Sequence, residues 1–245
     1  MPRRLIVIPA RLASSRLPDK PLADIAGKPM VLRVHDLCVS AGLGQVAVAT
    51  DSEAIADCVR QAGATAVMTR SDHQSGTDRV AEAVGAIDPD RRFDIIVNMQ
   101  GDYPTLDPHV LQAAVDVFDR SEADIATVCS VITDEAEKTD PNAPRLIGTP
   151  VAEDLLRALY FTRGIAPWGD GPHYHHIGLY AFRRAALERF VALEPSPLEQ
   201  RERLEQLRAL EAGMRIDAAI VEAAPIGVDT PADLALARAH FSSAL

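Results

Sequence analysis

Short apolar runs alternate with segments of helical periodicity in the first half of the chain, and this alternation is the strongest constraint on the fold. Residues 5–8 (LIVI) are apolar throughout, which is typical of a parallel strand covered on both faces. Further strands are predicted at 45–50, 65–69, 94–99 and 125–132. Helices are predicted from 31 to an end at Ala41-Gly42, from a cap at Asp51 or Ser52 to 61, at 77–87 and at 107–120. This pattern predicts an α/β fold with an open, mainly parallel, Rossmann-like sheet and helices on both faces.

The pattern changes after about residue 135. Strands are predicted at 157–163 and 176–182, on either side of a Pro/Gly-rich loop at 164–172. Helices at 184–193 and 197–212, a strand at 216–221 and a helix at 231–241 follow. Because no linker or internal repeat is visible, we expect a single domain, 1–245, in which 136–222 form an inserted smaller lobe on the substrate side and 223–245 a closing segment.

The chain is acidic, with 25 Lys and Arg against 35 Asp and Glu and a net charge of −10. Proteins that bind nucleic acid usually present a basic face, so no nucleic-acid partner is expected. No apolar run approaches the roughly 20 residues that span a bilayer, and the N-terminus lacks the features of a signal peptide, so no membrane partner is expected either. The three cysteines are isolated and odd in number, as in a reducing compartment, and the expected location is the cytoplasm.

A loop with three cations follows the first predicted strand. Arg11, Arg16 and Lys20 lie among small residues in PARLASSRLPDKP. Ligands of open α/β sheets bind beyond the carboxyl ends of the strands, and such a cluster in an acidic protein suits a polyphosphate. The stretch matches neither G-x-x-x-x-G-K-[ST] nor G-x-G-x-x-G, however. A solvated basic loop explains the charge spacing equally well.

Two aspartates follow other predicted strands. Asp102 stands in NMQGDYP, after a glycine that allows close backbone approach, and Asp229 stands in GVDTP. Two carboxylates at strand ends can hold Mg²⁺, which keeps several waters and pairs with substrate phosphates. Helix capping also explains Asp229, and a turn also explains Asp102. The residues alone favour a nucleotide-binding, Mg²⁺-dependent α/β enzyme.

Longer stretches carry a resemblance to a known family. They are IPARLASSRLPDKPL, VATDSEAIADCV, TRSDHQSGTDRVAE, IIVNMQGDYP, ALYFTR, HHIGLYAF, EPSPLEQRERLEQLRALEAG and GVDTPADL. They run in this order from Ile8 to Leu234, nearly the whole chain, and the first, third and last are highly specific in combination. The sequence closely resembles the 3-deoxy-manno-octulosonate cytidylyltransferases, also called CMP-Kdo synthetases.

The resemblance implies transfer of CMP from CTP to the anomeric hydroxyl of 3-deoxy-D-manno-octulosonate (Kdo), with release of pyrophosphate, for lipopolysaccharide synthesis. It implies a nucleotide-binding half at 1–135 and a lobe for sugar binding and dimerisation at 136–222. The residues implied to bind the nucleotide are Arg11, Ser14, Arg16, Lys20, Gln74, Ser75 and Gly76. The implied catalytic residues are Arg16 and Lys20, which would neutralise the leaving pyrophosphate, and Asp102 and Asp229, which would hold Mg²⁺.

The sugar-binding residues follow from the same resemblance. They are Gln100, Arg163, His176, Tyr180, Glu205 and Gln206. Arg163 is expected to hold the Kdo carboxylate, because a guanidinium offers two parallel N–H donors. Glu205 and Gln206 are expected to point at sugar hydroxyls from a helix whose other charged side chains are solvated.

The chain departs from the family pattern in places. Many members have an acidic residue after the aspartate of QGD, where Tyr103 stands here, so a second metal contact is not expected from that side chain. A common N-P-N-x-V-K is replaced by DPNAPR at 140–145, and the role of this loop cannot be transferred. The loop at 164–172 is short, which can alter the lid over the sugar.

Two alternatives stay open beside this function. One is a CMP-sugar synthetase for another sugar acid, sialic acid or 8-amino-Kdo; the other is a catalytically silent nucleotide-binding or scaffold protein. The expected partners are CTP, Kdo and a second copy of the chain. A homodimer is implied by the resemblance, and apolar positions on the charged helices at 187–212 suit such an interface.

Overall fold

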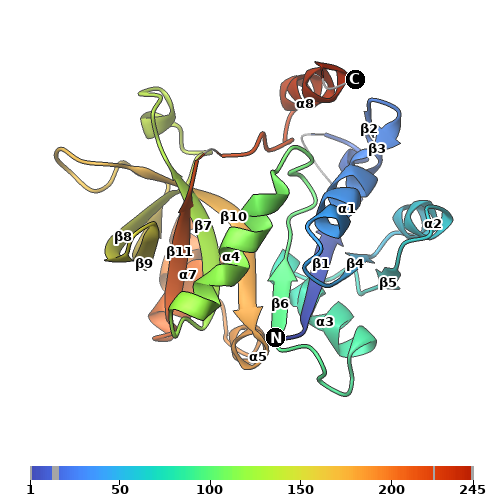
Figure 1. Cartoon of the computed structure of the whole chain (residues 1–245), viewed down its shortest axis with the longest axis horizontal. Helices are drawn as coiled ribbons and strands as arrows, with labels where there is room; N and C mark the ends of the chain where they lie inside the picture. Colours follow the sequence, from blue (N-terminus) through green and yellow to red (C-terminus); the bar gives the residue numbers. More distant parts are fainter. Residues whose placement is uncertain (1, 13–16, 223, 244–245) are drawn as a thin grey trace. The chain divides into compact units, whose positions relative to one another are not determined.

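A computed structural model describes residues 2–12, 17–222 and 224–243 of the chain. The chain divides into two compact units, Met1–Leu111 with Pro225–Leu245, and Gln112–Ala224. Each unit combines a sheet with helices, so the fold is mixed α/β (Figure 1). In the described part of the chain, no helix has both the length and the apolar character needed to cross a membrane.

The sheet of the first unit consists of parallel strands. β1 (Arg4–Ala10), β4 (Gln45–Thr50), β5 (Ala66–Met68) and β6 (Ile95–Asn98) lie in the order β5-β4-β1-β6. In register, Ile6 of β1 pairs with Val46 on one side and Val97 on the other. Its side chain and those of its neighbours in β1 are fully buried, which is why this run carries no polar residue.

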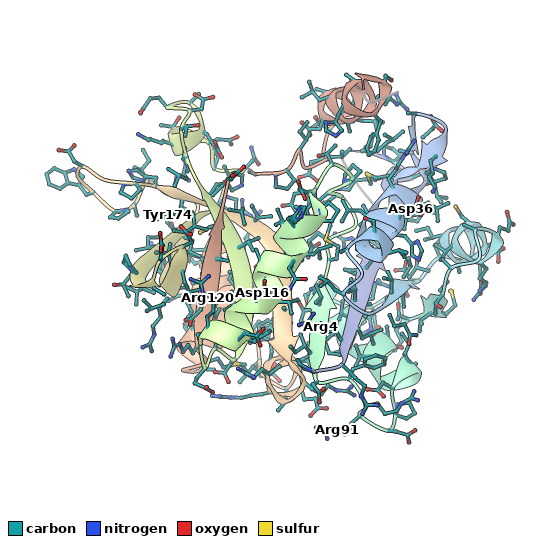
Figure 2. The ribbon with its side chains drawn as sticks, viewed as in Figure 1. Arg4, Asp36, Arg91, Asp116, Arg120 and Tyr174 are labelled. Atoms are coloured by element: carbon teal, nitrogen blue, oxygen red, sulfur yellow. The ribbon has the colours of Figure 1, made fainter. Side chains whose placement is uncertain are left out.

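Helices connect these strands. α1 (Met30–Ser40), α2 (Glu53–Gln61) and α3 (Gly76–Ile87) follow β3, β4 and β5, and parallel strands require such crossovers. A short helix η1 (Lys20–Leu22) and a ribbon of β2 (Asp24–Ile25) and β3 (Lys28–Pro29) precede α1. Lys28 of the ribbon forms an ion pair with Asp36 of α1 (Figure 2).

The C-terminal helix α8 (Pro231–Ser243) belongs to the first unit and shares a small apolar cluster with the residues that flank η1, with the ribbon and with α1. Its buried members are Leu17, Ile25, Met30, Val228, Leu234 and Ala237. The guanidinium of Arg33 in α1 lies 4.4 Å from the ring centre of Phe241, a cation–π contact. Because Val228 is fully buried in this cluster, the backbone next to Asp229 is held in place.

The sheet of the second unit is mostly antiparallel. β10 (Tyr174–Arg183), β7 (Ile125–Val131), β11 (Ile216–Val221), β9 (Leu155–Thr162) and β8 (Arg145–Ala152) lie in the order β10-β7-β11-β9-β8. β7 and β11 pair in parallel, whereas β10–β7, β10–β8, β11–β9 and β8–β9 pair antiparallel. The expected mainly parallel sheet is wrong for this unit. Glu153 and Asp154 alone separate β8 from β9, which is too short for the crossover that parallel strands need.

The remaining elements surround this sheet. α4 (Pro108–Arg120) contains the boundary between the two units, and Arg120 near its end donates a hydrogen bond to the carbonyl of Glu153 (Figure 2). A short helix η2 (Glu137–Thr139) precedes β8. The side chain of Arg145, the first residue of β8, is fully buried and donates to the carbonyls of Glu137 and Arg163 at 2.9 and 3.0 Å. The loop at 140–145 is therefore tied to the end of β9.

A single helix at 197–212, as the sequence indicates, is not formed. α5 (Arg184–Val191) is followed by α6 (Pro197–Glu202) and α7 (Gln206–Glu211), because Arg203 adopts the left-handed conformation with φ 57° and ends α6. Arg208 of α7 donates to both carboxylate oxygens of Glu199 in α6, at 2.6 and 2.7 Å, and holds α7 against α6. Arg208 is buried, so the expectation that the other charged side chains here are solvated is wrong for this residue.

Candidate active site

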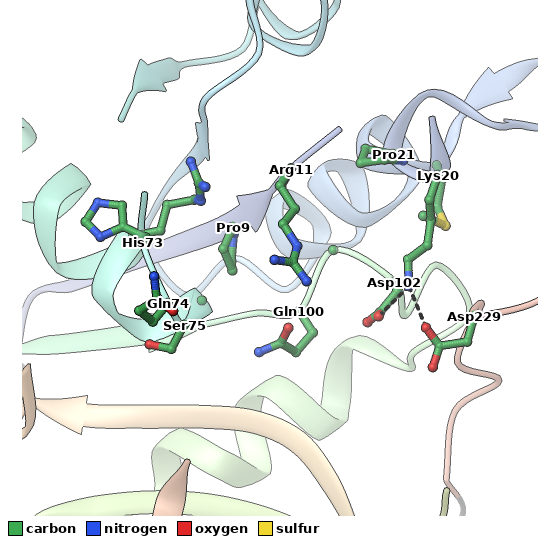
Figure 3. Close-up of a pocket in the computed structure, with 15 residues that line it drawn as sticks. Pro9, Arg11, Lys20, Pro21, His73, Gln74, Ser75, Gln100, Asp102 and Asp229 are labelled. Atoms are coloured by element: carbon green, nitrogen blue, oxygen red, sulfur yellow. Dashed lines mark hydrogen bonds and ion pairs between the residues drawn. The ribbon is translucent and has the colours of Figure 1, made fainter. Parts of the chain in front are cut away.

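A cavity of about 320 Å³ lies at the carboxyl ends of β1 and β6 in the first unit. Its walls come from the end of β1, from η1, from the start of α3 and from the segment that follows β6 (Figure 3). The lining residues are Pro9, Ala10, Arg11, Lys20, Pro21, Met30, His73, Gln74, Ser75, Gly76, Arg79, Gln100, Gly101, Asp102 and Asp229. Cations, an amide-rich helix start and two carboxylates thus face one space.

The segments that carry Asp102 and Asp229 are joined by hydrogen bonds. The amide of Val228 donates to the carbonyl of Asp102 at 2.9 Å. Further along the same segments, the amide of Ile226 donates to the Thr105 hydroxyl at 3.2 Å. These contacts bring together two aspartates that are far apart in the sequence, at one end of the cavity (Figure 3).

The ring of Tyr103 packs against the second of these segments. A Cβ atom at Gly227 would lie 3.2 Å from Cε1 of Tyr103, closer than most real Cβ contacts, so the glycine leaves the room that the ring occupies. The residue that stands where many family members have an acidic side chain therefore contributes packing next to Asp229.

Lys20 links the two carboxylates directly. Its ammonium donates to Oδ2 of Asp102 at 2.8 Å and to Oδ1 of Asp229 at 2.9 Å (Figure 3). The Lys20 side chain is 15% exposed, against 29% for Asp102 and 47% for Asp229. Burial alone lowers the pKa of Lys20, but the charges and hydrogen bonds of the two aspartates outweigh it and raise the pKa above its ordinary value. Lys20 is thus a fully charged cation between two acceptors.

Asp229 is positioned by the start of α8. The carboxylate of Asp233 accepts hydrogen bonds from the amides of Asp229 and Thr230 at 3.1 and 2.8 Å, and from the Thr230 hydroxyl at 2.8 Å. The amide of Asp233 in turn donates to the Thr230 hydroxyl, which completes a reciprocal cap. A helix, α8, therefore starts here as the sequence predicts. The carboxylate that caps it belongs to Asp233 and not to Asp229. The Asp229 side chain points into the cavity instead.

The start of α3 forms the opposite wall. Ser75 caps α3, because its hydroxyl accepts from the amide of Asp78 at 3.1 Å and donates to the carboxylate of Asp78 at 2.8 Å. A Cβ at Gly76 would lie 3.5 Å from Pro9 and 3.9 Å from the amide nitrogen of Gln100, so α3 approaches the end of β1 closely. Gln74 and Gln100, from the predicted nucleotide and sugar sets respectively, line the same cavity.

Two further lining residues, His73 and Arg79, were not singled out from the sequence. Arg79 is almost fully buried and donates to the Thr69 hydroxyl at 2.6 Å and to the carboxylate of Asp51 at 2.8 Å. His73 contacts the carboxylate of Glu82. Both flank QSGT in the stretch DHQSGTDR, so the signal that could have identified them is the motif that pointed to Gln74.

The second unit holds other residues of the predicted sugar set, beginning with Arg163. The side chain of Arg163 donates to the carbonyls of Pro141 and Glu202 at 2.7 and 3.0 Å. The carboxylate of Glu202, which was not singled out from the sequence, accepts from the Arg163 amide and from the Thr162 hydroxyl, both at 2.9 Å. The end of β9 is therefore fixed to α6, and the guanidinium is oriented by two backbone acceptors.

His176 and Tyr180 lie in the interior of the second unit. The ring of His176 packs edge-on against Phe161, with ring centres 4.8 Å apart, and lies 5.4 Å from the ring centre of Tyr180. Its Nε2 is 2.9 Å from the hydroxyl oxygen of Thr127. Burial, with a smaller effect of His175, lowers the pKa of His176 to about 3, so the ring is neutral at physiological pH.

Gln206 begins α7 and is also buried. Within the described residues, its Nε2 has no hydrogen-bond partner. A buried N–H group without an acceptor costs free energy that a ligand oxygen can restore. Glu205, directly before it, is half-buried. The predicted residues Ser14 and Arg16 lie outside the described residues.

Comparison with known proteins gives one consistent result. Residues 5–216 match the family model described as cytidylyltransferase. The chain is 62% identical to a 3-deoxy-manno-octulosonate cytidylyltransferase from Azorhizobium caulinodans, over 98% of this chain and 96% of that protein. It is 60% identical to a protein of the same name from Mesorhizobium japonicum, over 98% of this chain and 99% of that protein.

A solved structure is similar over the whole length. It is described as CMP:2-keto-3-deoxy-manno-octonic acid synthetase complexed with CTP, and it superimposes with a TM-score of 0.90. The two chains are 38% identical, and the match covers 99% of this chain and 100% of the other.

Proposed function

The chain belongs to the 3-deoxy-manno-octulosonate cytidylyltransferases, and from this premise we propose that it transfers CMP from CTP to Kdo and releases pyrophosphate. The observation that carries the proposal is the convergence of Asp102 and Asp229 beside Lys20 and Arg11 in one cavity. Phosphoryl and nucleotidyl transfer depend mainly on positioning and on compensating negative charge, and this cavity offers groups for both.

CTP is the proposed occupant of the cavity. The similar solved structure is described as complexed with CTP, and it covers nearly all of this chain. Arg11 and Lys20 supply cations for the phosphates, and Arg16 of the same stretch is proposed to join them. Gln74, Ser75 and Gly76 at the start of α3 are proposed to face the base and ribose. Ser14 completes the proposed nucleotide set.

Mg²⁺ is the proposed cofactor, held by Asp102 and Asp229. The donor set fits this ion, because two carboxylate oxygens lie within 2.9 Å of a single point, the Lys20 nitrogen, and Mg²⁺ uses one or two carboxylates together with substrate phosphates. When bound, Mg²⁺ would supply Lewis-acid polarisation of a phosphoryl oxygen. Tyr103, which follows Asp102, has no carboxylate to add to these two ligands.

The residues of this chain have separate roles in the proposed reaction. The anomeric hydroxyl of Kdo attacks the α-phosphorus of CTP through its oxygen and gives its proton to solvent, and the bond from that phosphorus to the leaving pyrophosphate breaks. Lys20 and Arg16 neutralise charge on the pyrophosphate. Arg163 holds the Kdo carboxylate, since its carbonyl contacts fix the direction of the guanidinium.

Gln100, His176, Tyr180, Glu205 and Gln206 are proposed to complete the sugar site. The buried amide nitrogen of Gln206 supports this role, because a sugar hydroxyl can accept its hydrogen bond. His176 is neutral, so it would act through hydrogen bonding and packing and carry no charge toward the sugar.

A pyrophosphate-release assay with purified protein, CTP and Mg²⁺ tests this function. Kdo, 8-amino-Kdo and sialic acid are supplied separately, and turnover is expected with Kdo. Turnover confined to another sugar acid would replace the substrate, and CTP binding without turnover on any of them would identify a silent nucleotide-binding protein.

Asp102→Asn and Asp229→Asn test the metal site in the same assay. Each change removes one anionic oxygen ligand and is expected to lower turnover by several orders of magnitude, or about 4 kcal/mol or more, while circular dichroism stays unchanged. Near-normal turnover of either variant at limiting Mg²⁺ would remove that residue from the site.

The assembly and the cellular setting form a further part of the proposal. We propose a single nucleotidyltransferase domain with an open, Rossmann-like nucleotide half and an inserted lobe, acting as a cytoplasmic homodimer in lipopolysaccharide synthesis. Large apolar side chains exposed in the second unit, including Leu159 and Trp168, support self-association through that unit. The cysteines Cys38, Cys58 and Cys129 are free, which agrees with a reducing compartment.

A further inference from the structure

The ammonium of Lys20 lies at the point where the carboxylates of Asp102 and Asp229 converge (Figure 3). We propose that Lys20 is a resident counter-cation of this pair, which must leave before a divalent metal ion can bind there, so that the metal enters together with the nucleotide. The inference rests on the proposed function, because it assigns Lys20 a role in loading the metal site in addition to binding phosphate.

The geometry places the two occupants in competition. Both nitrogen–oxygen distances, 2.8 and 2.9 Å, are those of charge-assisted hydrogen bonds, so the ammonium occupies one oxygen of each carboxylate and lies in the space between them where a shared metal would bind. A metal on these oxygens would lie within a few ångströms of the ammonium, and like charges at that distance repel strongly in a partly buried site. The Lys20 side chain is 15% exposed, so water screens this repulsion poorly.

The backbone around Lys20 restricts the exchange to its side chain. The amide of Ala23 donates to the carbonyl of Lys20 at 3.1 Å, and the amide of Leu22 donates to the carbonyl of Asp19 at 2.8 Å. Pro21 between them is buried. A four-carbon side chain with rotatable bonds can nevertheless turn its ammonium from the carboxylates toward other acceptors in the same cavity.

The nucleotide supplies the alternative acceptor. Triphosphate oxygens in this cavity would compete for the ammonium and release the two carboxylates for the metal. Binding of nucleotide and binding of metal are then coupled, and by linkage each raises the affinity for the other by the same factor. Without nucleotide, the wild-type protein is expected to bind the metal weakly, because the Lys20 ammonium already contacts both carboxylates and offsets one of their two negative charges.

Metal binding to the free protein tests the proposal without any turnover. Mn²⁺ serves as the probe, and its free concentration is read from the electron paramagnetic resonance signal. Lys20→Met and Lys20→Gln remove the charge and are expected to bind Mn²⁺ at least tenfold more tightly than the wild type. Lys20→Arg keeps a cation and should behave as the wild type does. Lys28→Met is the matched control, because Lys28 pairs with Asp36 and does not line the cavity.

Two further measurements locate the effect. The double variant Lys20→Met with Asp102→Asn should lose the gain in Mn²⁺ affinity, which places the ion on this carboxylate. In thermal unfolding, Lys20→Met should melt below the wild type without metal, because two carboxylates then lie close together without the ammonium between them, and should gain more from added Mn²⁺ than the wild type does.

Equal or weaker Mn²⁺ binding by both uncharged variants would overturn the proposal, and so would a gain of the same size in Lys28→Met. These outcomes are independent of the enzymatic activity, because no nucleotide or sugar is present. Failure of the proposed function is read separately, as wild-type protein that releases no pyrophosphate from CTP with any of the three sugar acids.

Discussion

Arg79 offers the most informative single substitution in the first unit. Its guanidinium is almost fully buried and donates to Asp51 at 2.8 Å and to Thr69 at 2.6 Å, and Arg79 lines the same cavity as Gln74. Arg79→Met keeps a side chain of similar length but removes the charge and both hydrogen bonds. The carboxylate of Asp51, only 17% exposed, then loses its cation.

The cost follows from that burial. Removing one partner of a buried ion pair typically destabilises a protein by about 3–5 kcal/mol, and the residual exposure of Asp51 places the value at the lower end, about 3 kcal/mol. In a chain of this size each kcal/mol lowers the melting temperature by about 2–4 °C, so a decrease of about 6–12 °C is expected. Part of this cost arises because the Asp51 carboxylate is left without its cation. The double variant Arg79→Met with Asp51→Asn should therefore be more stable, by about 1 kcal/mol or more, than the sum of the two single effects predicts.

Urea and thermal unfolding of the four members of this cycle measure the coupling. Arg60→Met is the control, because Arg60 pairs with Glu53 and Asp57 on an exposed helix surface and should cost less than about 0.5 kcal/mol. A melting temperature of Arg79→Met within 2 °C of the wild type, or additive effects of the Arg79 and Asp51 changes, would refute the argument from burial.

Three other outcomes are expected. Arg163→Lys should raise the KM for Kdo about tenfold and leave that for CTP nearly unchanged, because a single ammonium cannot replace two parallel N–H donors; a change confined to CTP would place Arg163 on the nucleotide side. Burial raises the pKa of Asp233, but the hydrogen bonds from Thr230 and from the Asp229 amide outweigh burial and hold the pKa below its ordinary value. The stability that this carboxylate contributes is therefore present above the ordinary pKa and is lost as the pH falls through the lower pKa of the folded state. Asp233→Asn should therefore cost about 1 kcal/mol of stability at pH 7 and almost nothing in strong acid, and a cost that does not change with pH would contradict this. Sedimentation at micromolar concentration should give twice the mass of one chain, and the mass of a single chain would exclude the homodimer.

The strands of the first unit were predictable because each is a local pattern. The expected strand at 45–50 is β4 without change, and the expected strand at 5–8 is the centre of β1. Such strands are buried on both faces, so the apolar run is present in the sequence regardless of what packs on it. The helix at 53–61 was equally predictable from the sequence, since Ser52 stands at its N-cap.

The second unit was less predictable because its decisive contacts are not local. β8 was not expected, since Gly148 and Pro150 interrupt its apolar pattern; Pro150 is tolerated where β8 pairs with β9 alone. The break between α6 and α7 also lacks a glycine or proline signal, because Arg203 itself takes the left-handed conformation. The pairing of Arg208 with Glu199, which favours this break, joins residues from two helices.

The candidate site also combines features that a local sequence pattern predicts with features that depend on contacts between distant segments. Motifs identified Asp102, Asp229 and Lys20 separately, each with a structural alternative, but no local pattern states that one ammonium bridges both carboxylates. That arrangement depends on the hydrogen bonds of Thr105 and Val228 between distant segments. Arg79 and Glu202 were missed for the same reason, because their partners lie in other elements.

Tyr103 shows how a departure from a family pattern can be explained by packing. From the sequence, its position after Asp102 suggests only the loss of an acidic side chain. In the structure its ring lies against Gly227, where an added Cβ would approach to 3.2 Å, so the ring and the glycine depend on each other. The amide of the next residue, Val228, donates to the carbonyl of Asp102. A bulkier residue at 227 would therefore have to displace the ring or lengthen that hydrogen bond, and either change would separate the two aspartates that the cavity needs together.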